Sequence, residues 1–217
     1  MIDRRWRASV EQGLEPVGRV LVRAGISADA LTIFGLAAAV ATAVLIANGN
    51  LVWAVFGLIA TGIPDILDGS VARQSGTANE RGAFFDSVFD RIADAVILGG
   101  VAWHLSTEGS QLSILVFAVL ALTMLVSYER AKAEALGLSA QGGIMERLER
   151  FVLLGIGLAL DILIPVLWIM LALTAITAAH RFVMVWRQAT PKAVGKSSRS
   201  KRTPRARRPR RISRVSS

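Results

Sequence analysis

Four aspartates in one short stretch of the chain have the type and spacing to hold divalent cations. The stretch reads DILDGSVARQSGTANERGAFFDSVFD and covers residues 65–90. Asp65 and Asp68 are three residues apart, and Asp86 and Asp90 are four apart, so on helices each pair shares a face. Converging carboxylates in a low dielectric repel one another unless a cation neutralises them. With no His or Cys nearby, these oxygens suit Mg²⁺, Mn²⁺ or Ca²⁺ and not Zn²⁺, and two such ions would balance four charges.

Small and basic residues beside the aspartates indicate a phosphate ligand. Gly69 follows Asp68 directly, and Gly82 lies one helical turn before Asp86. A missing side chain lets a bulky phosphate group approach the backbone, and the planar guanidinium of Arg73 can meet its oxygens. A single aspartate can simply complement a helix dipole or pair with an arginine. Four aspartates at two helical spacings, with these neighbours, favour a metal-assisted phosphoryl-transfer site.

Long apolar segments surround the aspartates and indicate an integral membrane protein. The chain has 217 residues, of which 53% are hydrophobic, and it has no Cys, which excludes disulfides and thiolate metal sites. Residues 30–64 contain no charged side chain, and the Asn-Gly-Asn turn at residues 48–50 divides them into two spans. Residues 109–128 and 162–179 are uncharged as well, so each predicts one further span.

Two shorter apolar segments decide the number of spans. Each is too short to cross the membrane unless the charged residues before it enter the membrane zone. For residues 95–107 these are Asp86, Asp90 and Asp94, and for residues 151–160 they are Arg147 and Arg150. With four spans, the basic residues of 129–161 would face outward, whereas with six the outer loops contain no Lys or Arg. We therefore predict an all-α integral membrane protein with six transmembrane helices, multi-pass in the plasma membrane, with both termini in the cytoplasm.

The two flanks of the predicted membrane domain, residues 29–188, are basic. Residues 1–28 carry apolar side chains at helical spacing among arginines, which predicts an interfacial amphipathic helix. Of the 25 Lys and Arg residues, eleven lie in residues 191–217, a segment without Asp or Glu and rich in Pro and Ser. We predict that residues 189–217 form a disordered cytoplasmic tail that binds anionic lipid headgroups, in preference to nucleic acid.

The aspartate stretch resembles the signature of the CDP-alcohol phosphotransferases, D-x2-D-G-x2-A-R-x8-G-x3-D-x3-D. The resemblance implies an enzyme that binds a CDP-linked lipid and two Mg²⁺ ions, or Mn²⁺, and transfers the phospholipid group to an alcohol with release of CMP. It implies that Asp90 is the catalytic base as well as a metal contact. The matched positions are Asp65, Asp68, Gly69, Ala72, Arg73, Gly82, Asp86 and Asp90, and the implied metal ligands are Asp65, Asp68, Asp86 and Asp90.

The same resemblance implies where the CDP-lipid lies. The segment ISADALTIFG, residues 26–35, is similar to the nucleotide-contacting start of the first span in this family. Ala28 departs from that pattern, which has proline at this place, and Asn79 stands where serine or threonine is common. The implied CDP-lipid contacts are Asp29, Ala30, Leu31, Thr32, Gly69, Ala72, Arg73, Asn79 and Gly82.

A second polar cluster is similar to the actinobacterial phosphatidylinositol phosphate synthases of that family. Residues 127–150, SYERAKAEALGLSAQGGIMERLER, match Y-x-[KR]-A-[KR]-A-E-A-x-G followed by E-R-x-E-R. The resemblance implies CDP-diacylglycerol and 1D-myo-inositol 3-phosphate as substrates, phosphatidylinositol phosphate as product, and a homodimer in the membrane. The implied contacts to the acceptor phosphate are Arg130, Lys132, Arg147, Arg150 and Arg181.

Two other functions stay open from the sequence. Glycerol 3-phosphate as acceptor would give phosphatidylglycerol phosphate, and it needs the same cations, although the spacing of the basic residues in 127–150 favours inositol phosphate. A divalent-cation transporter would also place carboxylates in the membrane. It would be expected to show helix breaks near the bilayer midplane and an internal repeat, and we find no such repeat in the sequence.

Overall fold

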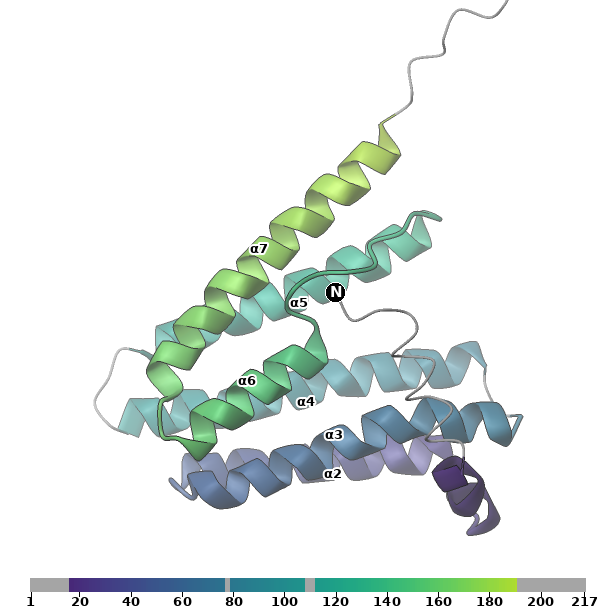
Figure 1. Ribbon diagram of the computed structural model, residues 1–217, viewed down its shortest axis with the longest axis horizontal. Coiled ribbons are helices and arrows are strands. Elements are labelled where there is room, and N and C mark those ends of the chain that lie inside the picture. The colour runs from purple at the N-terminus through teal and green to yellow at the C-terminus, as the bar shows by residue number, and fades with distance from the viewer. Residues whose placement is uncertain (1–15, 77–78, 108–111, 191–217) are drawn as a thin grey trace, which may run out of the picture.

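Helices are the only regular secondary structure in the residues that the computed structural model describes, 16–76, 79–107 and 112–190 (Figure 1). The predicted all-α class is therefore confirmed for this part of the chain. The predicted basic tail and residues 1–15 of the predicted interfacial segment lie outside it, while residues 16–23 are helical. The longer helices are α2 Ala28–Ala47, α3 Leu51–Gln74, α4 Glu80–Thr107, α5 Ser113–Ala135, α6 Arg147–Ala159 and α7 Leu163–Ala189.

Local sequence signals set the ends of the first long helix. Ser27 caps α2, because its Oγ accepts a hydrogen bond from the backbone N–H of Ala30 at 3.2 Å. Gly49 turns the chain from α2 into α3 with a φ of +75°, a conformation that glycine adopts without a steric penalty. The turn predicted at residues 48–50 is thus confirmed.

Small residues let α2 lie close to both α3 and α4. A Cβ added at Gly57 of α3 would stand 2.4 Å from Thr42 Oγ1, and one added at Gly100 of α4 would stand 2.6 Å from the carbonyl oxygen of Ala43. Such close approach through small residues is typical of helices that pack in membranes. As a result, α3 and α4 both pack against α2, and their side chains meet beside it.

The remaining helices complete the bundle around a shared apolar core. α5 packs against α4 and α7, and α6 packs against α3 and α7 (Figure 1). Fully buried core residues come from most of the helices, among them Ile46, Ile97, Val101, Val119 and Leu167. The packing of α6 matters most for the site, because it brings the first turn of this helix, residues 147–150, against the polar faces of α3 and α4.

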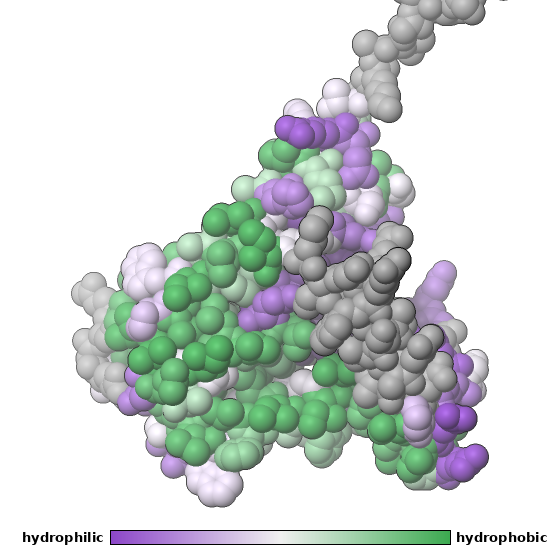
Figure 2. Space-filling view, in the orientation of Figure 1, coloured by the Kyte–Doolittle hydropathy of each residue, from purple (hydrophilic) through white to green (hydrophobic). Residues whose placement is uncertain are grey.

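The described surface is largely apolar. α2, α3, α5 and α7 are long and apolar enough to cross a membrane, whereas α4 carries several charges in its 28 residues and α6 has only 13 residues. Large apolar side chains such as Trp53 and Phe117 point outward and are 66% and 69% exposed. Hydrophobic residues cover much of the face seen in Figure 2, with hydrophilic ones gathered toward the C-terminal ends of α3 and α7. The chain is an integral membrane protein, and the count of six spans stays a prediction.

Candidate active site

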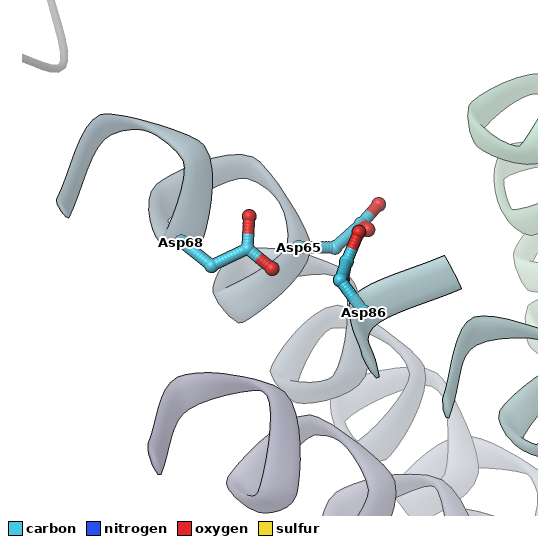
Figure 3. Close-up of side chains that lie close together, drawn as sticks. All are labelled: Asp65, Asp68 and Asp86. Atoms are coloured by element: carbon cyan, nitrogen blue, oxygen red, sulfur yellow. The ribbon is translucent and has the colours of Figure 1, made fainter. Parts of the chain in front are cut away.

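Three of the four predicted metal ligands converge between α3 and α4. Asp65 and Asp68 lie on α3 and Asp86 on α4, and one carboxylate oxygen from each lies within 4.8 Å of the others. In Figure 3 the carboxylates of Asp65 and Asp86 lie side by side, and that of Asp68 turns toward them. The predicted convergence of aspartates from two antiparallel helices is thus seen for these three, which we call the carboxylate cluster.

The carboxylate cluster fits a hard divalent cation. Asp68 Oδ2 is buried and has no hydrogen-bond partner among the described residues, and a buried anionic oxygen without a partner is costly unless a cation meets it. All three donors are carboxylate oxygens, the ligands that Mg²⁺ and Mn²⁺ prefer. The residues present therefore match the chemistry of such an ion.

Asp90 lies one helical turn beyond Asp86 and is paired with arginines. Its Oδ1 contacts Nη1 of Arg147, and its Oδ2 lies 3.6 Å from Nη1 of Arg91. In this arrangement Asp90 stands beside the carboxylate cluster and outside the group of oxygens that could share one ion. Its predicted roles as base and metal contact stay predictions.

The first turn of α6 places two arginines and a further aspartate next to these groups. Arg147 Nη1 lies 3.1 Å from Asp65 Oδ1, and Arg147 Nε lies 3.5 Å from Asp94 Oδ1. Arg150 donates a hydrogen bond from Nη2 to Asp94 Oδ2 at 3.0 Å, and both of these side chains are buried. Sequence reasoning assigned no role to Asp94, although it continues the four-residue spacing of Asp86 and Asp90.

A cavity of about 520 Å³ opens beside the carboxylate cluster and gathers most of the predicted CDP-lipid contacts. Ala30 and Leu31 were also predicted but do not line it, while Arg81 lines it without having been predicted. Asp68 and Asp86 form part of the same wall, so a ligand in the cavity would touch the carboxylate cluster. The predicted contacts that line it are Asp29, Thr32, Gly69, Ala72, Arg73, Asn79 and Gly82.

Residues at the N-termini of two helices line this cavity. The capping residue Ser27 lines it at the start of α2, and Asn79 lines it before α4, where its Oδ1 accepts a hydrogen bond from Gly82 N–H at 2.8 Å. Helix N-termini carry partial positive charge and unpaired N–H groups, which favour phosphate. Arg73 and Arg81 add two cations to the lining. The cavity therefore combines an anion-binding wall with the carboxylate cluster.

The five predicted acceptor-phosphate contacts lie on three helices, at the end of α5, at the start of α6 and on α7. Arg147 and Arg150 lie beside the aspartates, as described above. Arg130 and Lys132 lie on the exposed end of α5, where Arg130 Nε donates to Glu134 Oε1 at 3.0 Å. Arg181 is 3% exposed and donates to the carbonyl oxygens of Gly142 and Val126 at 2.9 Å and 3.1 Å. Electrostatic interactions link Arg181 to Arg130 and to Arg150, and the joint role of the five stays a prediction.

Comparisons with known proteins agree on one family. Residues 26–190 match the model of the family described as CDP-alcohol phosphatidyltransferase. The chain is 36% identical over 193 residues to the phosphatidylinositol phosphate synthase of Mycobacterium marinum, covering 83% of this chain and 82% of that one. It is 34% identical over 205 residues to the synthase of the same name from Streptomyces avermitilis, covering 87% and 84%.

Solved structures of such a synthase share the fold. The structure of Mycobacterium tuberculosis phosphatidylinositol phosphate synthase with CDP-DAG bound superposes with a TM-score of 0.74 at 30% identity, covering 85% of this chain and 98% of that one. A second structure of that synthase, in complex with manganese and citrate, gives the same TM-score and identity and covers 93% of that chain.

Proposed function

We propose a specific reaction for this chain, which belongs to the CDP-alcohol phosphatidyltransferase family. The chain transfers the phosphatidyl group of CDP-diacylglycerol to 1D-myo-inositol 3-phosphate, giving phosphatidylinositol phosphate and CMP. The predicted class of enzyme is confirmed by the family match over residues 26–190. The cavity beside the carboxylate cluster supports CDP-diacylglycerol as the donor, and the names of the relatives support inositol phosphate as the acceptor.

The carboxylate cluster holds the metal in this proposal. Asp65, Asp68 and Asp86 supply the ligand oxygens, with Asp90 as a further contact, and the cation is Mg²⁺, with two ions per site and Mn²⁺ as a substitute. When bound, the ions supply positive charge that stabilises the diphosphate and the departing CMP. The manganese in the M. tuberculosis relative supports a divalent cation of this kind.

The side chains of this chain then bind the two substrates, orient their phosphates and move one proton. The cytidine diphosphate lies in the cavity against Gly69 and Arg73, where the helix N-termini of α2 and α4 orient its phosphates. The oxygen of the acceptor hydroxyl bonds to the lipid-bearing phosphorus, and Asp90 accepts the proton of that hydroxyl. The bond from that phosphorus to the bridging oxygen breaks, and the electron pair leaves with CMP. Arg147 and Arg150, with help from Arg181 and the basic end of α5, bind the phosphate of the acceptor.

An acceptor comparison tests this assignment directly. Purified protein in detergent with CDP-diacylglycerol and Mg²⁺ is expected to release CMP when 1D-myo-inositol 3-phosphate is added, because the acceptor phosphate meets the arginines beside Asp90. Glycerol 3-phosphate and unphosphorylated inositol, added in parallel, are expected to give at least tenfold lower kcat/KM, a difference of about 1.4 kcal/mol. Lipid products identified by mass spectrometry provide the measurement.

Two results of this assay would contradict the proposal. A preference for glycerol 3-phosphate would assign the chain to phosphatidylglycerol phosphate synthesis within the same family. Equal rates with inositol and inositol phosphate would remove the phosphate-binding role of the arginines. A reaction without Mg²⁺, after treatment with a chelator, serves as the control for metal dependence.

We further propose that the chain is a homodimer in the plasma membrane, with six spans and both termini in the cytoplasm. Its catalytic domain covers residues 29–188, and the flanks 1–28 and 189–217 lie outside this domain. The polar ends of α3 and α7, seen together in Figure 2, support a common cytoplasmic side. The anionic substrate and the basic acceptor contacts also suit that side.

Cysteine labelling tests the number of spans. The natural chain has no Cys, so Asn50→Cys and Gln141→Cys each create one thiol, both at exposed positions. With six spans, a membrane-impermeant maleimide is expected to label Asn50→Cys in intact cells, and Gln141→Cys only after permeabilisation. Labelling of Gln141→Cys in intact cells would instead indicate that α4 and α6 do not cross.

A further inference from the structure

Arg147 bridges the two helices that carry the predicted metal ligands. Its Nη1 contacts Asp90 Oδ1 on α4 and lies 3.1 Å from Asp65 Oδ1 on α3. The guanidinium also stands over the Phe151 ring, 5.1 Å from its centroid, and only 16% of the side chain is exposed. One arginine from α6 thus neutralises carboxylates from two other helices, at the edge of the carboxylate cluster.

The contact of Arg147 with Asp94, through Nε, is weaker than its contacts through Nη1. Asp94 Oδ1 lies 3.5 Å from Arg147 Nε, yet each of these two buried atoms lacks a hydrogen-bond partner within the described part of the chain. Asp94 instead accepts its hydrogen bond from Arg150, through the other carboxylate oxygen. The attraction between Asp94 and Arg147 is therefore electrostatic, so the Arg147 guanidinium can shift without breaking a hydrogen bond at Nε.

Arg147 and a divalent cation need the same oxygens. Asp65 is part of the carboxylate cluster that fits the ion, and Asp90 is its predicted further contact. A guanidinium within hydrogen-bond distance of these carboxylates occupies the oxygen lone pairs that an ion would use, and two cations a few ångströms apart repel. Binding of one must therefore weaken binding of the other.

We propose that Arg147 is an internal counter-cation that occupies the metal ligands before the metal binds and is displaced by it. The inference rests on the proposed function, because it takes the carboxylate cluster as the metal site. On displacement, Asp90 loses its ion pair with Arg147 and keeps the one with Arg91, which leaves Oδ1 available to accept a proton. The freed guanidinium stays beside Arg150, where it adds a second cation for the acceptor phosphate. Metal binding thereby prepares both the base and the acceptor site in one side-chain movement.

Mn²⁺ titration of the purified full-length protein in detergent, after chelator treatment, tests the competition. Arg147→Gln is expected to bind Mn²⁺ about 5- to 100-fold more tightly than the natural chain, a range typical of coupling between linked sites. Arg91→Gln is the matched control. Arg91 Nη1 lies 3.6 Å from Asp90 Oδ2, so this variant also removes a positive charge next to Asp90, but Arg91 forms no described ion pair with Asp65. Its Mn²⁺ affinity is expected to change less than about threefold, as for a partly exposed charge.

Thermal unfolding with and without Mn²⁺ gives a second readout. If Arg147 is displaced by the metal, Arg147→Gln lowers the Tm of the metal-free protein more than that of the Mn²⁺-bound protein. An equal loss of Tm in both forms, or an unchanged or weaker Mn²⁺ affinity, would overturn the proposal. Should Arg147→Gln fail to fold, Arg147→Met carries the test, because it keeps a long unbranched side chain in the half-buried position without the positive charge, and tighter Mn²⁺ binding is still expected.

The titration also separates this inference from the proposed function. Mn²⁺ binding by the natural chain, with no difference for Arg147→Gln, would remove only the counter-cation role. No Mn²⁺ binding by any of these variants would remove the metal centre itself, and with it both proposals.

Discussion

Asp68→Asn is expected to lower metal-dependent turnover by orders of magnitude while the helices stay folded. The substitution keeps the shape of the side chain but removes the negative charge of the carboxylate. The Oδ2 atom of this carboxylate is buried without a hydrogen-bond partner in the described structure. Because charge stabilisation around a transferring phosphoryl group is worth orders of magnitude in rate, we expect kcat to fall by roughly 10²- to 10³-fold or more. CMP release measures this effect, and Mn²⁺ titration measures the accompanying loss of metal affinity.

The stability of the same variant distinguishes lost metal binding from lost folding. In the metal-free protein the carboxylates of Asp65, Asp68 and Asp86 repel one another, so Asp68→Asn is expected to leave the Tm unchanged or to raise it. Mn²⁺ should raise the Tm of the natural chain and have little effect on the variant, since only the former binds the ion tightly. A variant that retains full turnover and the full Mn²⁺-induced shift would exclude Asp68 as a ligand.

Asp161→Asn provides the matched control for this experiment. It makes the same chemical change at an exposed position between α6 and α7, at the end of α6 opposite to Arg147. Asp161 has a φ of +55°, a conformation that asparagine tolerates well. Turnover and the response to Mn²⁺ are therefore expected to match those of the natural chain.

The convergence of the carboxylates could be predicted because it depends on local spacing and on one chain reversal. Asp65 and Asp68 share a helical face by their separation, and α3 and α4 are joined by a short connection, so Asp86 returns to the same depth. The glycines and Arg73 of the cavity follow from the same local pattern. These features need only helix geometry and the order of the elements.

The partners of Asp90 and Asp94 could not be predicted in the same way. Apart from Arg91, which neighbours Asp90 on α4, they come from the first turn of α6, and Arg147 is 82 residues away from Asp65, with which it forms a hydrogen bond. Which face of a short helix meets which neighbour depends on the packing of the whole bundle. A count of cations near a site likewise cannot tell which donors the protein itself uses, as Arg181 shows with its bonds to two backbone carbonyls.

Asp90→Asn is expected to separate binding from chemistry. The variant keeps the size of the side chain and a hydrogen-bond acceptor for Arg147, but its amide cannot take the proton of the acceptor hydroxyl. General-base catalysis contributes about 10²- to 10⁴-fold to rate, so kcat should fall within that range. Binding of CDP-diacylglycerol should persist, because Asp90 does not line the cavity. The rise in Tm that the bound lipid causes measures this binding.

A carboxylate on a longer side chain provides the control for this assignment. Asp90→Glu restores a group that can accept a proton, displaced by one methylene, and is expected to recover part of the lost turnover. Full activity of Asp90→Asn would remove Asp90 as the base, since no proton acceptor would then be missing. Loss of CDP-diacylglycerol binding together with turnover would instead assign Asp90 to ligand binding. Retained binding with turnover recovered only by a carboxylate is the pattern expected of a base that Arg147 has released.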